Sequence, residues 1–195
     1  QLAAVIADGQ EIRLQCELNG GIPSLPRVDL LLALPRPKVM NRLWPVLASL
    51  GVGRIFISNA WKTERCYFDS HVLEPAQIRA GLMEGLQQAQ DTRLPQVSVH
   101  RRFKKLIEDE LAGLESYAAR LVAQPRPRFF PIDRLSGLPA AGRVLLAACP
   151  EGGWIPSELE LLAAHGFTPV SWGPRTLRTD TACSVLLGFL HIALG

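Results

Sequence analysis

The chain between residues 28 and 58 alternates between continuous apolar runs and apolar positions at helical spacing. Val28 to Leu34 is apolar except for Asp29, which is typical of a strand buried on both faces of a parallel sheet. A helix follows, which Pro45 must either begin or kink. Its apolar positions recur at helical spacing: Met40, Leu43, Trp44 and Leu47. After Gly51, the run Arg54 to Ser58 predicts a second strand, so the pattern indicates a strand–helix–strand unit.

The same alternation continues toward the C-terminus. Pro75 to Gln90 has helical periodicity, and Val97 with Val99 predicts a short third strand. The next helix has a predicted buried side made of Phe103, Leu106, Ile107 and Leu111. Ala119 to Ala123 is a further apolar run, which we interpret as a strand.

Two later apolar runs each lead into a turn rich in glycine and proline. Val144 to Ala148 precedes the turn Cys149 to Gly153, and Thr168 to Ser171 precedes the turn Trp172 to Arg175. Glycines in such turns let a backbone approach a ligand that side chains would exclude. An open α/β sheet binds ligands at the carboxyl ends of its strands, so two such turns on neighbouring strands predict a ligand site.

Two helices flank these turns. The first is predicted to begin with a capping box of Ser157 and Glu160, and its predicted buried stripe is Leu159, Leu162 and Ala163. The last helix, Thr181 to Leu194, has no charged residue after Asp180, whose carboxylate suits the first turn of a helix. A helix that is apolar nearly all round needs burial on all sides, so we expect it to pack in a subunit interface as well as in its own core.

These residues resemble a known family. PEGGW from Pro150, GF from Gly166 and GPRTLRTDTA from Gly173 resemble the C-terminal signature of the RsmE-like methyltransferases, SPOUT-superfamily enzymes that methylate uridine at N3 in small-subunit ribosomal RNA. This combination over roughly forty residues is far more specific than a lone glycine motif. Ala33 to Ile55 and Thr92 to Val97 also match, so the resemblance covers about residues 28 to 195.

The resemblance implies a SPOUT-type α/β domain with a mostly parallel sheet flanked by helices and a C-terminal trefoil knot. It also implies S-adenosylmethionine as the cofactor, a homodimer with the site near its interface, and ribosomal RNA as the partner. Connection rules alone argue against a knot. The residues expected to bind the cofactor are Ala148, Cys149, Pro150, Glu151, Gly152, Gly153, Trp172, Gly173, Pro174, Arg175 and Leu177.

Methylation at N3 of uracil requires loss of the N3 proton, which a nearby cation favours. Arg178 is our first candidate for this catalytic role and Arg93 our second; a phosphate anchor or a salt bridge is the alternative for each. The densest positive cluster, Arg101 to Lys105, is either a solvated helix face or a phosphate-contact patch. The residues expected to contact RNA are Gln88, Arg101, Arg102, Lys104 and Lys105.

Several positions depart from the family pattern. Cys149 stands where the first turn usually begins with glycine, and Gln87 and Asp91 stand where the family has a glutamate and an arginine. A second hypothesis is therefore a SPOUT-fold dimer that binds S-adenosylmethionine or RNA without catalysis. A third is an ordinary Rossmann-type nucleotide-binding domain, although the chain lacks a strand–GxGxxG–helix unit.

Composition narrows the class of protein. The net charge is only +3, so a nucleic-acid surface must be a local patch. The four cysteines and four histidines are dispersed without metal-ligand spacing, so we expect no metal and a reducing cytosol. The apolar run from Ala182 to Leu194 is shorter than the ~20 residues of a membrane span, which favours a soluble cytoplasmic protein without a membrane partner.

Residues 1–26 alternate weakly and contain two turn signals, which predict a hairpin. They are too few for a barrel, whereas the resembled family carries an N-terminal PUA-like β-barrel domain that grips RNA. We therefore expect residues 1–26 to be a remnant of that domain with its linker, and residues 27–195 to be the methyltransferase domain. No apolar, positively flanked leader follows Gln1, so we expect a fragment rather than a signal peptide.

Overall fold

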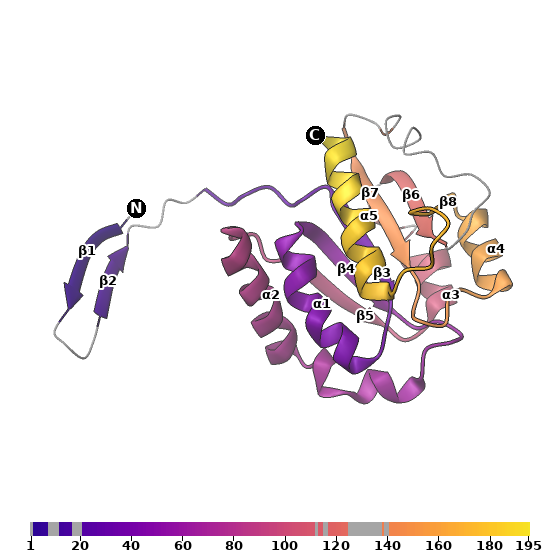
Figure 1. Cartoon of the computed structure of the whole chain (residues 1–195), viewed down its shortest axis with the longest axis horizontal. Coiled ribbons are helices and arrows are strands. Elements are labelled where there is room, and N and C mark those ends of the chain that lie inside the picture. The colour runs from indigo at the N-terminus through magenta and orange to yellow at the C-terminus, as the bar shows by residue number, and fades with distance from the viewer. Residues whose placement is uncertain are drawn as a thin grey trace.

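A computed structural model describes residues 2–7, 12–16, 21–111, 113–114, 117–124, 138 and 141–195 of the 195-residue chain. The N-terminal hairpin is confirmed: β1 (Leu2–Ala7) pairs antiparallel with β2 (Ile12–Cys16). This hairpin is a separate two-stranded sheet, and Figure 1 shows it apart from the main domain.

The main domain is built on a six-stranded sheet in which every pairing is parallel, as the continuous apolar runs predicted. Its order is β5-β4-β3-β7-β6-β8. All six residues of the central strand, β3, are buried, as a strand covered on both faces requires. The strands are β3 (Val28–Ala33), β4 (Val52–Ser58), β5 (Gln96–His100), β6 (Tyr117–Ala123), β7 (Arg143–Ala148) and β8 (Phe167–Val170).

The strand order separates this sheet from an ordinary Rossmann domain. Counted from β3 as the first strand of the domain, the order is 3-2-1-5-4-6, whereas the dinucleotide-binding order is 3-2-1-4-5-6. The third hypothesis is therefore wrong. β6 lies between β7 and β8, so the expectation that the two turns follow neighbouring strands is also wrong. Because all the strands are parallel, both turns still lie at the carboxyl edge of the sheet.

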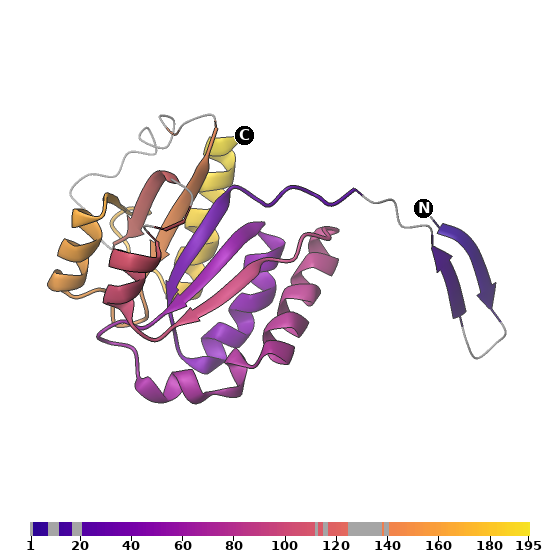
Figure 2. The same ribbon diagram turned by 180° about the vertical axis from the view of Figure 1, so that it is seen from behind.

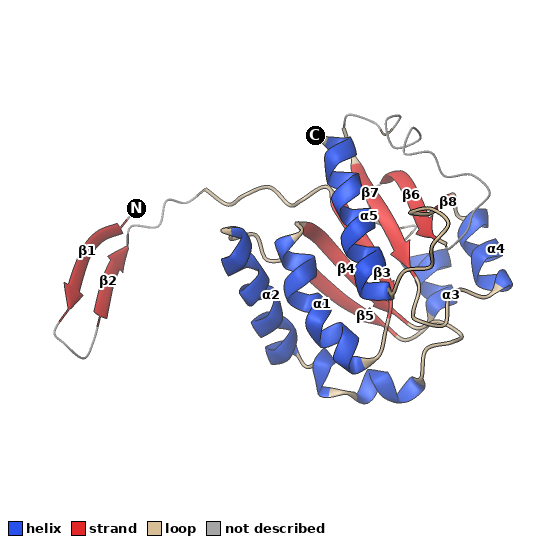
Figure 3. Cartoon of the chain, in the orientation of Figure 1, coloured by secondary structure: helices blue, strands red, loops and turns tan. Residues whose placement is uncertain are grey.

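Helices cover both faces of the sheet (Figures 1 and 2). One face packs against α1 (Pro37–Ser49), α2 (Pro75–Ala89) and α5 (Thr179–Leu194). The other packs against α3 (Phe103–Lys105), the π-helical turn η3 (Leu106–Glu110) and α4 (Pro156–Ala164). Two short 3-10 turns, η1 (Arg65–Asp69) and η2 (His71–Leu73), connect β4 to α2 (Figure 3). None of the helices in the described ranges is long and apolar enough to cross a lipid bilayer.

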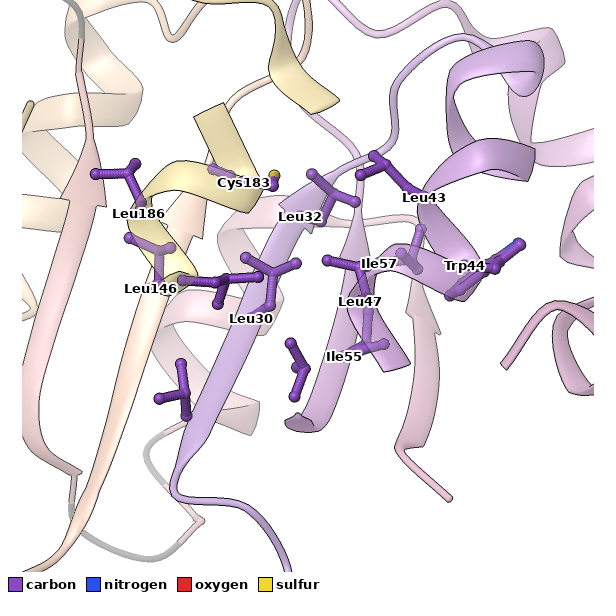
Figure 4. Packing of buried hydrophobic residues seen from close by; sticks show 14 of the residues in the cluster. Leu30, Leu32, Leu43, Trp44, Leu47, Ile55, Ile57, Leu146, Cys183 and Leu186 are labelled. Carbon is purple, nitrogen blue, oxygen red and sulfur yellow. The ribbon is translucent and has the colours of Figure 1, made fainter. Parts of the chain in front are cut away.

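The larger core lies between the sheet and α1, α2 and α5 (Figure 4). Trp44 is fully buried there, and its indole N–H donates to the carbonyl of Val72 over 3.1 Å. Two glycines of α2, Gly81 and Gly85, face Trp44 and Pro45 so closely that a Cβ on either would collide with α1. α1 begins at Pro37, so Pro45 lies inside the helix instead of beginning it.

The start of α4 differs from the predicted capping box. Pro156 is its first residue, because proline has a fixed helical φ and lacks the N–H that an interior position would need. Glu158 then takes the third position, and its Oε2 accepts a hydrogen bond from the Ile155 N–H at 2.9 Å. The predicted box of Ser157 and Glu160 is therefore wrong. Ala163, predicted to be buried, is exposed.

Candidate active site

The first turn follows β7 without interruption, and three other segments hold it. The carboxylate of Glu151 accepts from the Arg36 N–H at 3.1 Å, and Lys62 Nζ donates to the Gly152 carbonyl at 2.8 Å. The Thr179 hydroxyl donates to the Cys149 carbonyl at 3.3 Å. Residues from the start of α1, the loop after β4 and the start of α5 thus fix one short piece of backbone.

Glycine conformation shapes both turns. Gly153 has a φ of +74° and Gly173 a φ of +138°, which are values that residues with a Cβ rarely adopt. In the second turn the hydroxyl of Ser171 donates to the Gly173 carbonyl at 3.0 Å and accepts from the Gly173 N–H at 3.1 Å. The Trp172 ring packs on Phe189 of α5, with 4.9 Å between ring centroids.

The two turns enclose a pocket of about 490 Å³ at the carboxyl ends of β7, β6 and β8. This volume is within the range of about 300–1,000 Å³ that is usual for small-molecule sites. Eight of the eleven predicted cofactor residues line the pocket, together with Arg178. The eight are Ala148, Cys149, Pro150, Glu151, Gly153, Trp172, Arg175 and Leu177.

Other predicted cofactor residues do not line the pocket. Gly152 is turned toward Lys62, so that a Cβ on it would meet the lysine side chain at 2.8 Å, and neither Gly173 nor Pro174 contributes to the wall. Several lining residues were missed: Arg36, Val39, Ala123, Gln124, Val170, Ser171, Thr176, Thr179, Asp180, Ala182 and Leu186. Gln124 and Ser171 follow strands directly, so the rule that ligands bind at strand carboxyl ends could have found them.

The two cysteines near the pocket are neutral thiols. Burial raises the pKa of Cys149, with the Glu151 carboxylate adding to the rise, and hydrogen bonds from backbone N–H groups oppose it. Burial raises the pKa of Cys183, on the inner face of α5, to about 12. Neither group therefore presents a thiolate to the pocket at neutral pH.

Arg178 lies at the mouth of the pocket beside Asp180. Its Nη2 is 3.5 Å from Asp180 Oδ2, and Arg42 of α1 approaches the same oxygen at 3.2 Å. Partial burial opposes ionisation of Asp180, but the Thr181 N–H and the two arginines outweigh it and lower the pKa of this carboxyl. The Arg178 side chain is 71% exposed, so the ion pair leaves most of its guanidinium available.

Arg93 lies at the opposite edge of the sheet. It precedes the amino end of β5, whereas the pocket lies at the carboxyl ends of the strands, and its N–H donates to Asp91 at 3.0 Å. A single chain therefore does not bring Arg93 and Arg178 together.

Acidic partners partly neutralise the basic cluster that follows β5. Arg101 bonds Asp69 at 2.9 Å, Lys104 lies 3.6 Å from Glu108, and Lys105 lies 3.9 Å from Glu110. Arg102 is exposed, as is Gln88 near the end of α2. Their contact with RNA stays a prediction.

Within the described ranges, no group of three histidine, cysteine, aspartate or glutamate side chains could hold a metal ion.

Known proteins resemble the chain in sequence. It is 32% identical over 170 residues to the ribosomal RNA small subunit methyltransferase E of Treponema pallidum. This alignment covers 84% of this chain and 63% of that protein. It is 30% identical over 176 residues to the protein of the same name from Mycobacterium bovis, covering 87% and 64%. The chain thus spans less than two thirds of the length of these relatives.

Solved structures share the fold. A methyltransferase from Legionella pneumophila in complex with its bound cofactor SAM superposes with a TM-score of 0.74 at 22% identity, covering 93% of this chain and 72% of that one. The ribosomal RNA small subunit methyltransferase E from Neisseria gonorrhoeae, bound to S-adenosyl methionine, gives 0.72 at 18% identity, covering 86% and 66%. The α/β fold expected from the resemblance is confirmed.

A family model agrees with these relatives. The model described as the RNA methyltransferase domain matches residues 23–191, which include the whole six-stranded sheet and both turns of the pocket. This chain therefore belongs to the RNA methyltransferase domain family.

Proposed function

We propose that this chain is the catalytic domain of an S-adenosylmethionine-dependent methyltransferase that modifies N3 of a uridine in small-subunit ribosomal RNA. The observation that carries the proposal is the pocket formed by the two glycine-containing turns, which the matched family model includes. The names of the relatives and the cofactor in the two solved structures support the same reaction and cofactor. A bacterial cytoplasmic location fits this reaction.

The pocket residues suit the proposed cofactor, which when bound supplies an electrophilic methyl group. Val39, Leu177 and Leu186 offer apolar walls, while backbone groups of the two turns can bond an adenosine. Glu151 and Asp180 would supply negative charge for a sulfonium, and Arg36 and Arg175 could pair with a carboxylate. Because Cys149 is a neutral thiol, it does not compete with the RNA base for the methyl group.

Arg178 carries the proposed catalytic role. The uracil N3 proton would leave to solvent, and the Arg178 guanidinium would stabilise the resulting anion. Bound S-adenosylmethionine would supply the methyl group and leave as its demethylated product. The ion pair with Asp180 holds Arg178 at the mouth, where a base extruded from single-stranded RNA would enter.

A homodimer and a trefoil knot belong to the same proposal. α5 buries one face in its own chain, but Ile192 on its other face is 79% exposed and Trp172 beside it is 44% exposed. Such apolar surface suits a subunit interface. Arg93 lies too far from the pocket of its own chain to act there, so a catalytic role for it requires the pocket of a partner subunit.

Two measurements test the proposed function. Calorimetry with S-adenosylmethionine and its demethylated product should show binding of both, and tritiated methyl groups should pass to unmodified small-subunit RNA. Binding without transfer would support instead the second hypothesis, a dimer that has lost catalysis. Absence of cofactor binding would contradict both.

A further inference from the structure

A second pocket, of about 440 Å³, lies on the α3 and α4 side of the sheet. It is lined by the loop that follows β4, by the start of α3 and by the start of α4, including Asn59, Trp61, Phe103, Lys104 and Ile155. None of these residues belongs to the first pocket. The proposed cofactor site therefore leaves this pocket without a role.

A buried carboxylate holds the backbone of this pocket in place. Glu158 is 7% exposed, and its Oε1 accepts from the Trp61 N–H at 2.7 Å while its Oε2 accepts from the Ile155 N–H. The Asn59 N–H donates to the His100 carbonyl at 3.2 Å, and the Thr63 hydroxyl donates to the Leu34 carbonyl at 3.3 Å. The loop after β4 is thus fixed on both sides of Trp61.

This fixed loop presents an indole to solvent. The Trp61 side chain is 78% exposed, although its backbone is bonded to a buried group. An exposed aromatic ring on an ordered backbone is the usual platform for a nucleobase, because every base has a face that stacks and little conformational entropy is lost. Behind it, Phe103 forms an apolar wall and packs against Trp154, with ring centroids 5.3 Å apart.

Polar groups of the pocket suit a nucleotide. Asn59 lines the pocket, and its buried amide oxygen has no hydrogen-bond partner among the residues described. A rotation of this side chain toward the pocket lets the oxygen accept a base N–H, which removes the cost of leaving it unpaired. Lys104, at the rim, lies 3.6 Å from Glu108 in an exposed ion pair, and such weak pairs exchange readily for a phosphate.

The two pockets share a wall. Gly153 lines the first and Ile155 the second, and two residues of backbone span at most about 7 Å. Lys62, next to Trp61, bonds the Gly152 carbonyl of that wall. A nucleotide next to a base in the first pocket is therefore within reach of the second.

We propose that the second pocket binds a nucleotide that flanks the target uridine in single-stranded RNA. Its base stacks on Trp61 and bonds the amide of Asn59, and its phosphate meets Lys104. This inference rests on the proposed methyl transfer to RNA and adds the element that positions the strand.

Anisotropy of a short fluorescein-labelled single-stranded RNA, titrated with the full chain with and without S-adenosylmethionine, tests the proposal. Trp61→Ala should weaken RNA binding by about 5- to 150-fold, the range for loss of one base–aromatic stack. Trp61→Phe should restore most of the affinity, because a phenyl ring still stacks. Met83→Ala removes a side chain that is 41% exposed on α2, across the sheet, and should leave RNA binding unchanged.

Two measurements, the affinity for S-adenosylmethionine and the affinity for RNA, separate this inference from the proposed function. Calorimetry should give the same S-adenosylmethionine affinity for Trp61→Ala as for the unaltered chain; if the unaltered chain binds none, the proposed function fails independently of the anisotropy result. Equal RNA affinity of Trp61→Ala and the unaltered chain would overturn the inference. The inference would also be overturned if Trp61→Ala lowered the mass of the protein in solution but left its RNA affinity unchanged. Trp61 would then contact a second protein subunit and not RNA.

Discussion

The two edges of the parallel sheet differ in the surroundings of their charged side chains. At the amino edge, the fully buried Asp29 of β3 accepts from the Arg54 N–H at 2.7 Å, from the Tyr117 hydroxyl at 2.9 Å and from Arg143. Arg143 also donates to the Pro26 carbonyl at 2.8 Å, where the linker enters the domain. Every oxygen of this carboxylate is thus bonded within the protein.

At the carboxyl edge the charged groups are accessible to solvent. Arg36, Glu151, Arg175 and Arg178 line a pocket and are exposed to solvent. Polar groups thus have different roles at the two edges. Bonded groups at the amino edge join strands and linker, and they have no capacity left for a ligand, whereas open groups at the carboxyl edge can bind one.

Removing the buried carboxylate should have the largest effect. Asp29→Ala removes the buried carboxylate that pairs with Arg54 and Arg143, so the free energy of unfolding should fall by about 3–5 kcal/mol in urea denaturation. Asp180→Ala breaks a more exposed pair at the other edge and should cost no more than about 1 kcal/mol. Similar losses for the two variants would erase the contrast between the edges.

Arg178→Ala should affect catalysis rather than stability. Loss of one cation that stabilises a developing anion lowers transfer by about 10²–10³-fold, while S-adenosylmethionine affinity stays close to that of the unaltered chain. Single-turnover transfer of tritiated methyl groups measures the first quantity and calorimetry the second. Unchanged transfer would refute the catalytic role of Arg178.

Gly153→Ala should weaken the cofactor pocket through backbone strain. No heavy atom lies within 4 Å of the added Cβ, but φ is +74°, a conformation that costs a residue with a Cβ about 1–2 kcal/mol. The free protein can relieve this strain by moving the turn out of its binding conformation. S-adenosylmethionine affinity should therefore fall by up to about 5- to 30-fold, the factor for 1–2 kcal/mol. Gly188→Ala in α5 adds a Cβ in equally open space without positive φ and should raise stability by about 0.5–1 kcal/mol.

The smallest effect should come from pH. The Asp180 pKa lies below its ordinary 3.8, so its ion pairs are present above that value and are lost only as the pH falls through the lowered pKa. The Cys149 pKa lies above its ordinary 9.0, so its thiol stays neutral below that value. Calorimetry between about pH 6 and pH 8 should therefore give a constant S-adenosylmethionine affinity. A tenfold change in this range would reveal a titrating group in the pocket that these two do not explain.

The sequence by itself determined most of the secondary structure and the two turns of the first pocket. Apolar runs and helical periodicity depend on neighbouring residues, so they predicted β3, α1, β4, α2 and β5 with only small differences in their bounds. The turns of the pocket were found for the same reason, because glycine and proline restrict the local backbone whatever surrounds them.

Long-range packing decided the rest. Strand order placed β6 between β7 and β8, and no local pattern encodes that order. The same order brings Arg36 and Gln124 to the pocket and keeps Arg93 away from it. Glu158 was missed as the residue that caps α4 because its partner at the N-cap, Ile155, lacks the hydroxyl of a capping-box signature. Its second partner, the Trp61 N–H, lies 97 positions away along the chain. Local residue chemistry selects helices, strands and turns, but burial and pairing between distant segments decide which of their side chains meet.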